Sequence, residues 1–209
     1  LASIRLETEE KGESDPTAAG AETPVNLIVI MNESFSDLAE VFDLETNEDP
    51  LPFFHSLTEN TIRGTAYSSV FGGTTANSEY EFLTGNTMAF LPEGTVPFHM
   101  YVGEEEPNLG AQLGSLGYRT VFMHPYLSSG WNRRAVYQSF GFDEIYFQND
   151  FTDVSYMRNY ITDQSNYENL VRRYEEKEDG EPLFIFNVTM QNHSAYNVAW
   201  TGLDKTVWL

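Results

Sequence analysis

Three short apolar runs divide the chain and limit what it can fold into. Residues 25–31 (VNLIVIM), 118–124 (YRTVFMH) and 183–190 (LFIFNVTM) are rich in β-branched and aromatic side chains. Runs of this length and composition are typical of strands that are buried on both faces of a sheet. Helical patterns separate the runs, and alternation of strand and helix predicts a mostly parallel sheet. The expected fold is therefore α/β, with three α/β/α layers.

The segments between these runs carry helix signals. Several have helical apolar spacing, and two end in a glycine, which is a common helix stop. The expected helices cover residues 52–60, 72–86, 109–117, 133–141 and 155–177, and a further strand is expected near residues 61–70.

The composition excludes several classes of function. The formal net charge is −21, which repels nucleic acid, so no nucleic-acid partner is expected. The chain has no cysteine, which excludes disulfides, thiolate metal sites and a cysteine nucleophile.

Residues 1–24 are acidic and rich in small residues, and we expect a linker or arm there. We expect residues 25–209 to form one domain without internal repeats.

Polar residues follow the three predicted strands where each strand ends. Glu33 follows the first strand, His124 closes the second, and His193 follows the third. Because the carboxyl ends of parallel strands meet at one edge of a sheet, we expect these side chains to lie close together. Glu33 suits a metal that prefers oxygen ligands, or a helix start. Each histidine suits phosphate binding, proton transfer or a structural hydrogen bond, whereas His55 and His99 are assigned no role.

The residues GGTT at 72–75 predict a tight turn into a helix N-terminus, where backbone N–H groups favour a phosphoryl group. A threonine hydroxyl becomes an effective nucleophile when a cation bound to its oxygen lowers its pKa. The alternative is that Thr74 or Thr75 only caps the helix. Arg133, in the loop after His124, suits a bidentate contact with phosphate, or an ion pair with one of the many carboxylates.

Five spaced motifs together resemble the lipoteichoic acid synthase branch of the sulfatase and alkaline phosphatase superfamily. In order from about residue 24 to about 197, they are NLIVIMNESFSDL, LPFFHSL, FGGTTANSEYEFLTGNTMAFLPEGTVPF, HPYLSSGWNRRAVYQSFGFD and FNVTMQNHSAY. The resemblance implies an alkaline-phosphatase-like fold on the extracellular face of the bacterial cell membrane, anchored by transmembrane helices absent from this chain. It also implies a divalent ion, most often manganese with magnesium as the alternative. The implied reaction transfers phosphoglycerol from phosphatidylglycerol to a glycopolymer or glycolipid acceptor.

The resemblance assigns roles to six residues by motif. Glu33 matches a metal-ligand glutamate, and Thr75 matches the nucleophile that also binds the metal, with Thr74 as the alternative within the motif. The residues that match the phosphoglycerol pocket are His124, Trp131, Arg133 and His193. The implied mechanism is ping-pong: Thr75 attacks the donor phosphorus, diacylglycerol leaves, and the phosphoglycerol-threonine then reacts with an acceptor hydroxyl.

The sequence departs from the family pattern at two places. Tyr126 stands where the synthase has an aspartate, two residues after His124, so we expect a differently built pocket. The Asp-His pair that completes the family's metal site has no match before Leu209. We therefore expect a C-terminally truncated domain that binds metal poorly, is inactive alone and exposes an apolar sheet edge prone to self-association.

Four alternatives remain beside lipoteichoic acid synthesis. Sulfatases need a cysteine or serine where this chain has Thr75, and the membrane-anchored phosphoethanolamine transferases are rich in disulfides, so both are disfavoured. A phosphoglycerol transferase that acts on a periplasmic glucan is the nearest rival, because it shares the donor. A non-catalytic, glycolipid-binding sensor with the same fold is the last alternative.

Overall fold

A parallel sheet forms the centre of the molecule. The structure is a computed structural model that describes residues 25–103, 106–197, 200 and 206–208, so the predicted linker at 1–24 lies outside the described residues. The strands of the sheet follow the order β1-β6-β2-β3, and all three neighbouring pairs are parallel. Their bounds are β1 (Leu27–Met31), β2 (Arg119–His124), β3 (Glu144–Phe147) and β6 (Leu183–Val188).

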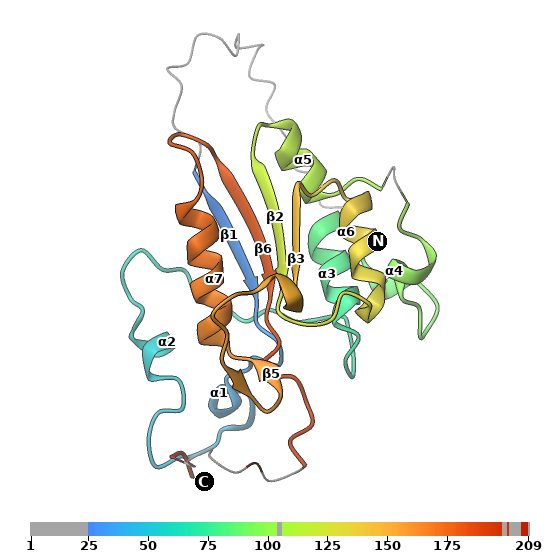
Figure 1. Cartoon of the computed structure of the whole chain (residues 1–209). Helices are drawn as coiled ribbons and strands as arrows, with labels where there is room; N and C mark the ends of the chain where they lie inside the picture. Colours follow the sequence, from blue (N-terminus) through green and yellow to red (C-terminus); the bar gives the residue numbers. More distant parts are fainter. Residues whose placement is uncertain (1–24, 104–105, 198–199, 201–205, 209) are drawn as a thin grey trace, which may run out of the picture.

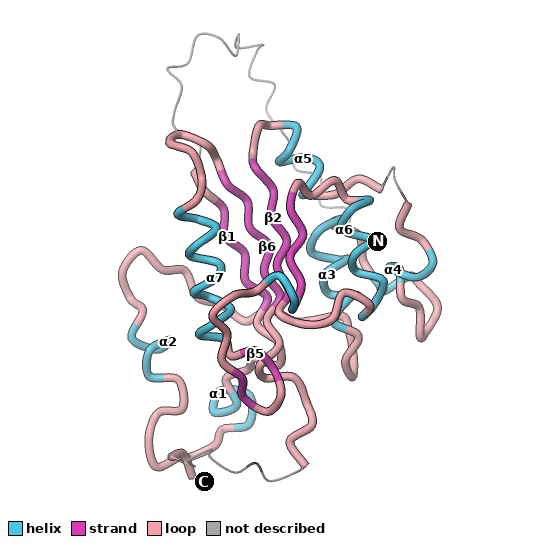
Figure 2. The backbone as a smooth tube through the Cα atoms, viewed as in Figure 1, coloured by secondary structure: helices cyan, strands magenta, loops and turns pink. Residues whose placement is uncertain are grey.

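Helices cover both faces of this sheet (Figure 1, Figure 2). On one face lies α7 (Asp163–Glu175). The opposite face carries α3 (Thr75–Thr84), α4 (Pro97–Met100), α5 (Leu109–Ser115) and α6 (Arg133–Ser139). The prediction of a three-layer α/β/α fold with a mostly parallel sheet is confirmed.

The remaining elements are short and lie outside the layers or between them. They are α1 (Leu38–Phe42), α2 (Pro52–Ser56), the antiparallel pair β4 (Tyr156–Met157) and β5 (Tyr160–Ile161), and the 3₁₀ turns η1 (Met88–Phe90), η2 (Gly130–Asn132) and η3 (Gln148–Asp150). None of the described helices is both long and apolar enough to cross a membrane.

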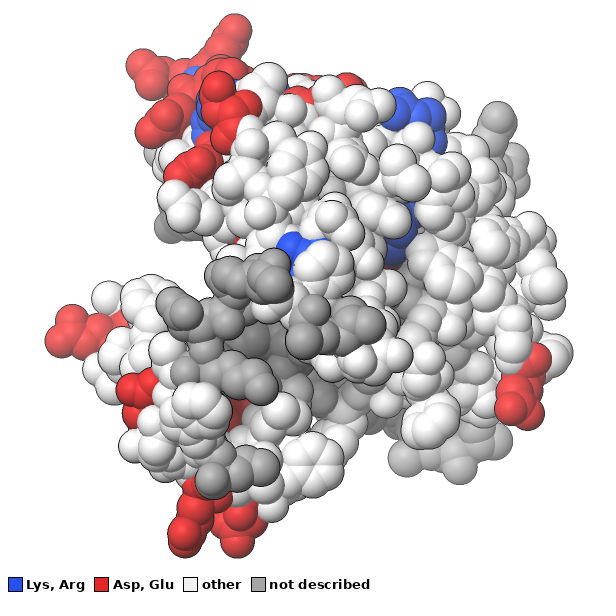
Figure 3. Space-filling view, turned by 60° about the horizontal axis from the view of Figure 1, so that its bottom comes forward, with Lys and Arg blue, Asp and Glu red and all other residues white. Residues whose placement is uncertain are grey.

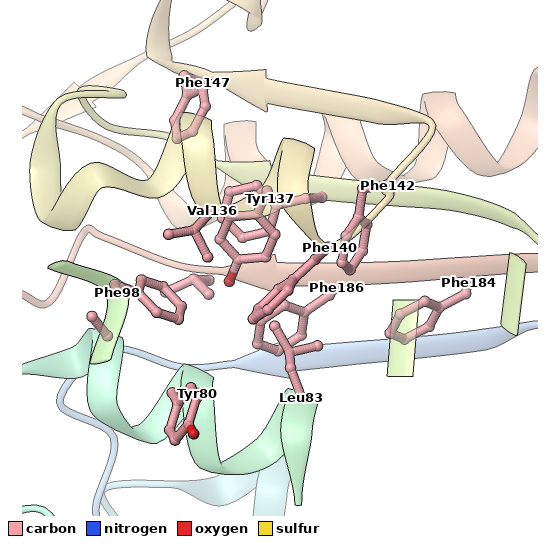
Figure 4. Packing of buried hydrophobic residues seen from close by; sticks show 13 residues of the cluster. Tyr80, Leu83, Phe98, Val136, Tyr137, Phe140, Phe142, Phe147, Phe184 and Phe186 are labelled. Atoms are coloured by element: carbon pink, nitrogen blue, oxygen red, sulfur yellow. The ribbon is translucent and has the colours of Figure 1, made fainter. Parts of the chain in front are cut away.

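Two hydrophobic clusters fill the space between the layers. Because successive strand residues point to opposite faces, Phe122 packs toward α3 and α6, while Val121 and Met123 pack toward α7. Figure 4 shows how aromatic rings dominate the first cluster. There the rings of Phe122 and Tyr137 stack, with centroids 3.4 Å apart. These contacts make β2 and β6 the buried centre of the sheet, as the sequence predicts.

β1 differs from the prediction that residues 25–31 are buried on both faces. It pairs with β6 and, among the described residues, with no second strand. Its side chains at Leu27, Ile28 and Ile30 are 39% to 42% exposed. The prediction was wrong because an edge strand has only one neighbour, and an apolar sheet edge is present in the described part of the chain.

The predicted helix over residues 155–177 is wrong in its first part. Arg158 and Asn159 both have positive φ angles, 53° and 68°, which is the backbone conformation of a two-residue hairpin turn. They join β4 to β5, so this part of the chain forms a hairpin. Thr162 then caps α7, because its side chain accepts a hydrogen bond from the backbone N–H of Ser165.

Two other predicted elements are shorter or missing. α2 covers only Pro52–Ser56 of the helix predicted over residues 52–60. Residues 61–70 are irregular, and Ile62 and Tyr67 are almost fully exposed. A β-branched segment without a neighbouring strand in the described structure has no partner for its backbone groups, so its local preference does not produce a strand.

We expect Phe122→Ala to lower the free energy of unfolding by about 3–5 kcal/mol, because the ring is fully buried and leaves a cavity. Urea denaturation measures this change. Phe71→Ala is the matched control, since the Phe71 side chain is fully exposed. Equal effects of the two substitutions would contradict the placement of Phe122 in the core.

Candidate active site

The carboxyl ends of the parallel strands meet at one edge of the sheet, the lower edge in Figure 1. Glu33 follows β1, His124 ends β2, and His193 follows β6, so all three leave this same edge as predicted. Figure 3 views the molecule from this end. Aspartate and glutamate gather at its periphery, and its middle is mainly uncharged with a few lysine or arginine atoms.

Thr75 and Glu33 are in contact. The Thr75 hydroxyl donates a hydrogen bond to Glu33 Oε2 over 3.2 Å. The backbone N–H of Glu33 in turn donates to Thr189 Oγ1 over 2.9 Å, which ties the carboxylate to the end of β6. Asp37, not Glu33, caps α1. The helix-start alternative for Glu33 therefore does not account for its position.

The glycine turn positions Thr75 at the start of α3. Gly72, Gly73 and Thr74 have positive φ angles of 74°, 110° and 65°, which brings the chain sharply into the helix. The side chain of Thr74 makes no capping hydrogen bond, and Thr75 is the first helical residue. Within the described residues, Thr75 and not Thr74 is the threonine whose hydroxyl contacts Glu33.

The two oxygen atoms of this pair suit a divalent ion. A carboxylate and a hydroxyl are hard oxygen donors of the kind that manganese and magnesium prefer. Nowhere in the described ranges do three or more histidine, cysteine, aspartate or glutamate side chains gather to hold a metal. Glu33 and Thr75 therefore fit as two of the ligands of a divalent ion.

His124 is buried and neutral. Its Nδ1 lies 2.9 Å from the carbonyl oxygen of Val188; a carbonyl only accepts, so Nδ1 carries the proton and donates. Burial, and to a lesser extent the nearby Arg133 guanidinium, lower the pKa of His124 to about 4. Nε2 is buried and has no partner among the described residues. At neutral pH this nitrogen can accept a hydrogen bond from a hydroxyl, but it has no proton to donate to phosphate.

Arg133 is buried in an ion pair, the alternative that the sequence left open, and its partner Glu79 is the part that the sequence did not identify. Its Nε lies 3.0 Å and 3.1 Å from the two carboxylate oxygens of Glu79, and the Tyr137 hydroxyl donates to the same carboxylate over 2.7 Å. Burial alone would raise the pKa of Glu79, but the Arg133 guanidinium holds it below its usual value. Nη1 makes no hydrogen bond within the part of the chain that the structure describes, which leaves one donor group of Arg133 for a ligand.

The spacing of the apolar residues in α3 indicates that Glu79 is buried. Ala76, Tyr80 and Leu83 form the buried side of this helix, and Glu79 lies among them with no exposed surface. A carboxylate on the apolar side of a helix requires a buried partner. Arg133 lies 54 residues away in sequence, so the local pattern does not reveal the partner.

Among the described residues, neither Trp131 nor His193 hydrogen-bonds to Glu33 or Thr75. Trp131 stacks on His99, with ring centroids 5.8 Å apart, and lines a hollow of about 480 Å³ that Thr74 also lines. His193 is half-buried, and its Nδ1 lies 3.0 Å from the carbonyl oxygen of Ser194. His193 also contributes to the lowered pKa of His124, less than burial and Arg133 do.

The model of one protein family, Sulfatase, matches residues 25–206. The chain belongs to the sulfatase family. It is 36% identical over 171 residues to a putative cyclic β-1,2-glucan modification protein of Rhizobium meliloti (strain 1021), which covers 82% of this chain and 26% of that protein. It is 26% identical over 180 residues to lipoteichoic acid synthase 1 of Bacillus subtilis (strain 168), covering 83% of this chain and 27% of that protein. The sulfatase-family chain thus spans about a quarter of the length of these two relatives.

Solved structures of related fold agree with this membership. The lipoteichoic acid synthase LtaP from Listeria monocytogenes superimposes with a TM-score of 0.70 at 22% identity, over 81% of this chain and 41% of that one. The Streptococcus pyogenes phosphoglycerol transferase GacH, in complex with sn-glycerol-1-phosphate, gives 0.69 at 22% identity, over 85% and 48%. At this identity the likeness establishes the fold, and the resemblance found from the sequence is confirmed at the level of the superfamily.

We expect Glu79→Leu to lower the free energy of unfolding by about 3–5 kcal/mol, because it leaves the Arg133 charge buried without a partner. Adding Arg133→Met should recover much of this loss, since no buried charge then remains. Chemical denaturation of the two single variants and the double variant measures the coupling. Additive losses would contradict a direct ion pair.

The lowered pKa of His124 predicts that the free energy of unfolding depends on pH. Its pKa is about 4 in the folded protein against 6.5 as the ordinary value, so the unfolded chain binds the extra proton first as the pH falls. The contribution of the neutral His124 to the free energy of unfolding is complete above pH 6.5 and is lost as the pH falls toward 4. Between pH 6.5 and 5 we expect the wild type to lose about 1.4 kcal/mol per pH unit more than His124→Gln. Equal slopes in pH-dependent denaturation would contradict a neutral, buried His124.

Proposed function

We propose that the protein transfers phosphoglycerol from phosphatidylglycerol to an envelope glycan or glycolipid, on the extracellular face of the bacterial cell membrane. The observation that carries this proposal is the hydrogen bond between Thr75, at the start of α3, and the Glu33 carboxylate. Relatives named as a lipoteichoic acid synthase and a phosphoglycerol transferase support it. Because the chain spans a quarter of its curated relatives, the activity is proposed for the whole protein.

Thr75 is the proposed nucleophile. A bond forms between Thr75 Oγ1 and the donor phosphorus as the bond from phosphorus to the diacylglycerol oxygen breaks. The hydroxyl proton is lost to solvent, and the departing oxygen takes up a proton. The oxygen of an acceptor hydroxyl then bonds to the same phosphorus and loses its proton, the bond between phosphorus and Thr75 Oγ1 breaks, and Oγ1 takes up a proton. Thr75 is the first residue of α3, so backbone N–H groups of the first helical turn would stabilise the negative charge on the phosphoryl oxygens.

Glu33 and Thr75 would hold the divalent ion, for which we propose manganese, with magnesium as the alternative. Sulfatase and alkaline phosphatase superfamily proteins are generally metal-dependent, which supports an ion at this position. When bound, such an ion lowers the pKa of the threonine hydroxyl and offsets the charge of the phosphoryl group.

The residues around this pair would bind the phosphoglycerol group. Arg133 has Nε and Nη2 fixed by Glu79, so its Nη1 is the group that would donate to a phosphate oxygen. Nε2 of His124 would accept a hydrogen bond from a glycerol hydroxyl, because that nitrogen carries no proton. His193 and Trp131 would close the pocket from the loop after β6 and from η2.

For the acceptor, the names of the relatives suggest two classes of envelope polymer, a cyclic glucan and a teichoic acid. The relative named for cyclic β-1,2-glucan modification is 36% identical to this chain, against 26% for the lipoteichoic acid synthase. The higher identity favours a glucan acceptor over the teichoic acid acceptor that the sequence motifs first suggest.

Intact mass spectrometry of the full-length protein, after incubation with manganese and phosphatidylglycerol, tests this function. We expect a phosphoglycerol adduct in the wild type and in Thr74→Ala, and none in Thr75→Ala. Glu33→Gln should slow adduct formation by on the order of 100-fold, because a bound metal supplies several kcal/mol of charge stabilisation. An adduct on Thr75→Ala would contradict the proposed nucleophile, and no adduct in any variant would contradict the proposed donor.

A further inference from the structure

A second hollow lies beside the candidate active site, between Tyr126 and the β4–β5 hairpin. Its volume is about 440 Å³, which is within the range that small ligands occupy in proteins. The hairpin lies beyond the carboxyl ends of the strands, at the lower edge in Figure 1. The residues that line the hollow are Tyr126, Arg158, Asn159, Tyr160, Ser194, Ala195, Asn197 and Trp200. None of them has a role in the proposed donor site.

Two residues that line the hollow, Tyr126 and Tyr160, contact the two histidines of the candidate site. The ring of Tyr126 meets that of His124 edge to face, with centroids 6.2 Å apart. Tyr160 meets His193 in the same way at 6.0 Å. Arg158 Nη2 donates to the carbonyl oxygen of His193 over 2.9 Å. A molecule bound in the hollow would therefore lie next to the residues that we propose for phosphoglycerol binding.

Aromatic and neutral polar groups dominate the lining. The Tyr126 and Tyr160 rings lie 5.7 Å apart, centroid to centroid, at an angle of 64°. Asn159, Asn197 and Ser194, whose side chains carry amide and hydroxyl groups, line the same hollow. Flat rings offer apolar faces, and amides and hydroxyls both donate and accept hydrogen bonds. A sugar ring needs both, because it has C–H faces and a rim of hydroxyls.

Most of the groups that line the hollow are neutral. Among the described residues of the lining, Arg158 is the only charged one. Its Nη2 already donates to the carbonyl oxygens of His193 and Ala195, and its guanidinium packs over the Tyr196 ring at 4.2 Å. Arg158 Nη2 therefore fixes the loop after β6, while its Nε is buried without a partner among the described residues. The other described groups of the lining are neutral.

We propose that this hollow binds a neutral sugar unit of the acceptor glycan, with Tyr126 and Tyr160 in contact with the sugar face. That the sugar belongs to an acceptor rests on the proposed function. The preference for a neutral sugar rests on the lining alone. Tyr126 and Tyr160 are thus acceptor-binding residues, and the hairpin that carries Tyr160 is the element that forms this part of the site.

Calorimetric titration of the full-length protein with cyclic β-1,2-glucan tests the proposal. We expect Tyr160→Ala and Tyr126→Ala each to raise the Kd roughly tenfold through loss of an aromatic contact, whereas Tyr160→Phe keeps the ring and stays close to wild type. Tyr156→Ala is the matched control, because Tyr156 belongs to the same hairpin, is 56% exposed and does not line the hollow. Its Kd should equal that of the wild type.

Glucan binding needs no donor, metal or turnover, so its result is separate from that of adduct formation. Wild-type protein that binds the glucan, with the expected loss in Tyr160→Ala, supports the hollow even if Thr75 forms no adduct, and only the proposed function then fails. Unchanged binding by Tyr160→Ala, an equal loss in Tyr156→Ala, or no glucan binding by the wild type would each overturn the sugar site. An adduct on Thr75 would leave the proposed function standing in those cases.

Discussion

The buried ion pair between Glu79 and Arg133 holds the candidate site together. It joins α3 to α6, and each of these helices begins at a residue of the site, Thr75 in α3 and Arg133 in α6. Charges that are removed from water interact strongly, and separating them leaves an uncompensated charge in an apolar core. Tyr137 donates to the same carboxylate and stacks on Phe122, so the pair is also fixed to the middle of the sheet.

Local patterns in the sequence predict most of the architecture. The three apolar runs predict β1, β2 and β6, and alternation with helices predicts that these strands are parallel. Because parallel strands end at the same edge of the sheet, this inference also predicts that Glu33, His124 and His193 leave that edge together. The glycine turn before Thr75 is likewise a property of neighbouring residues, because only a sharp reversal with positive φ angles brings the chain into α3 there.

What the sequence does not reveal depends on distant contacts. Arg133 suits phosphate or a carboxylate equally well by residue type, and only the fold brings Glu79 to it. The apolar spacing of residues 155–177 predicts one helix. The chain instead turns at Arg158 and Asn159, where two consecutive φ angles are positive, and forms the hairpin. The position of β1 at an edge likewise depends on which strands pair, and its composition alone does not show this.

The pairing of β1 with β6 has a consequence for folding. Leu27 lies opposite Phe184, and the Glu33 backbone bonds to Thr189, so the chain must close a loop of more than 150 residues before either contact exists. Closure over such a separation is entropically costly and slow, and β1 gains no other strand contact among the described residues. We therefore expect the Thr75–Glu33 pair to assemble only after β1 has paired with β6, and an incompletely folded chain to lack it.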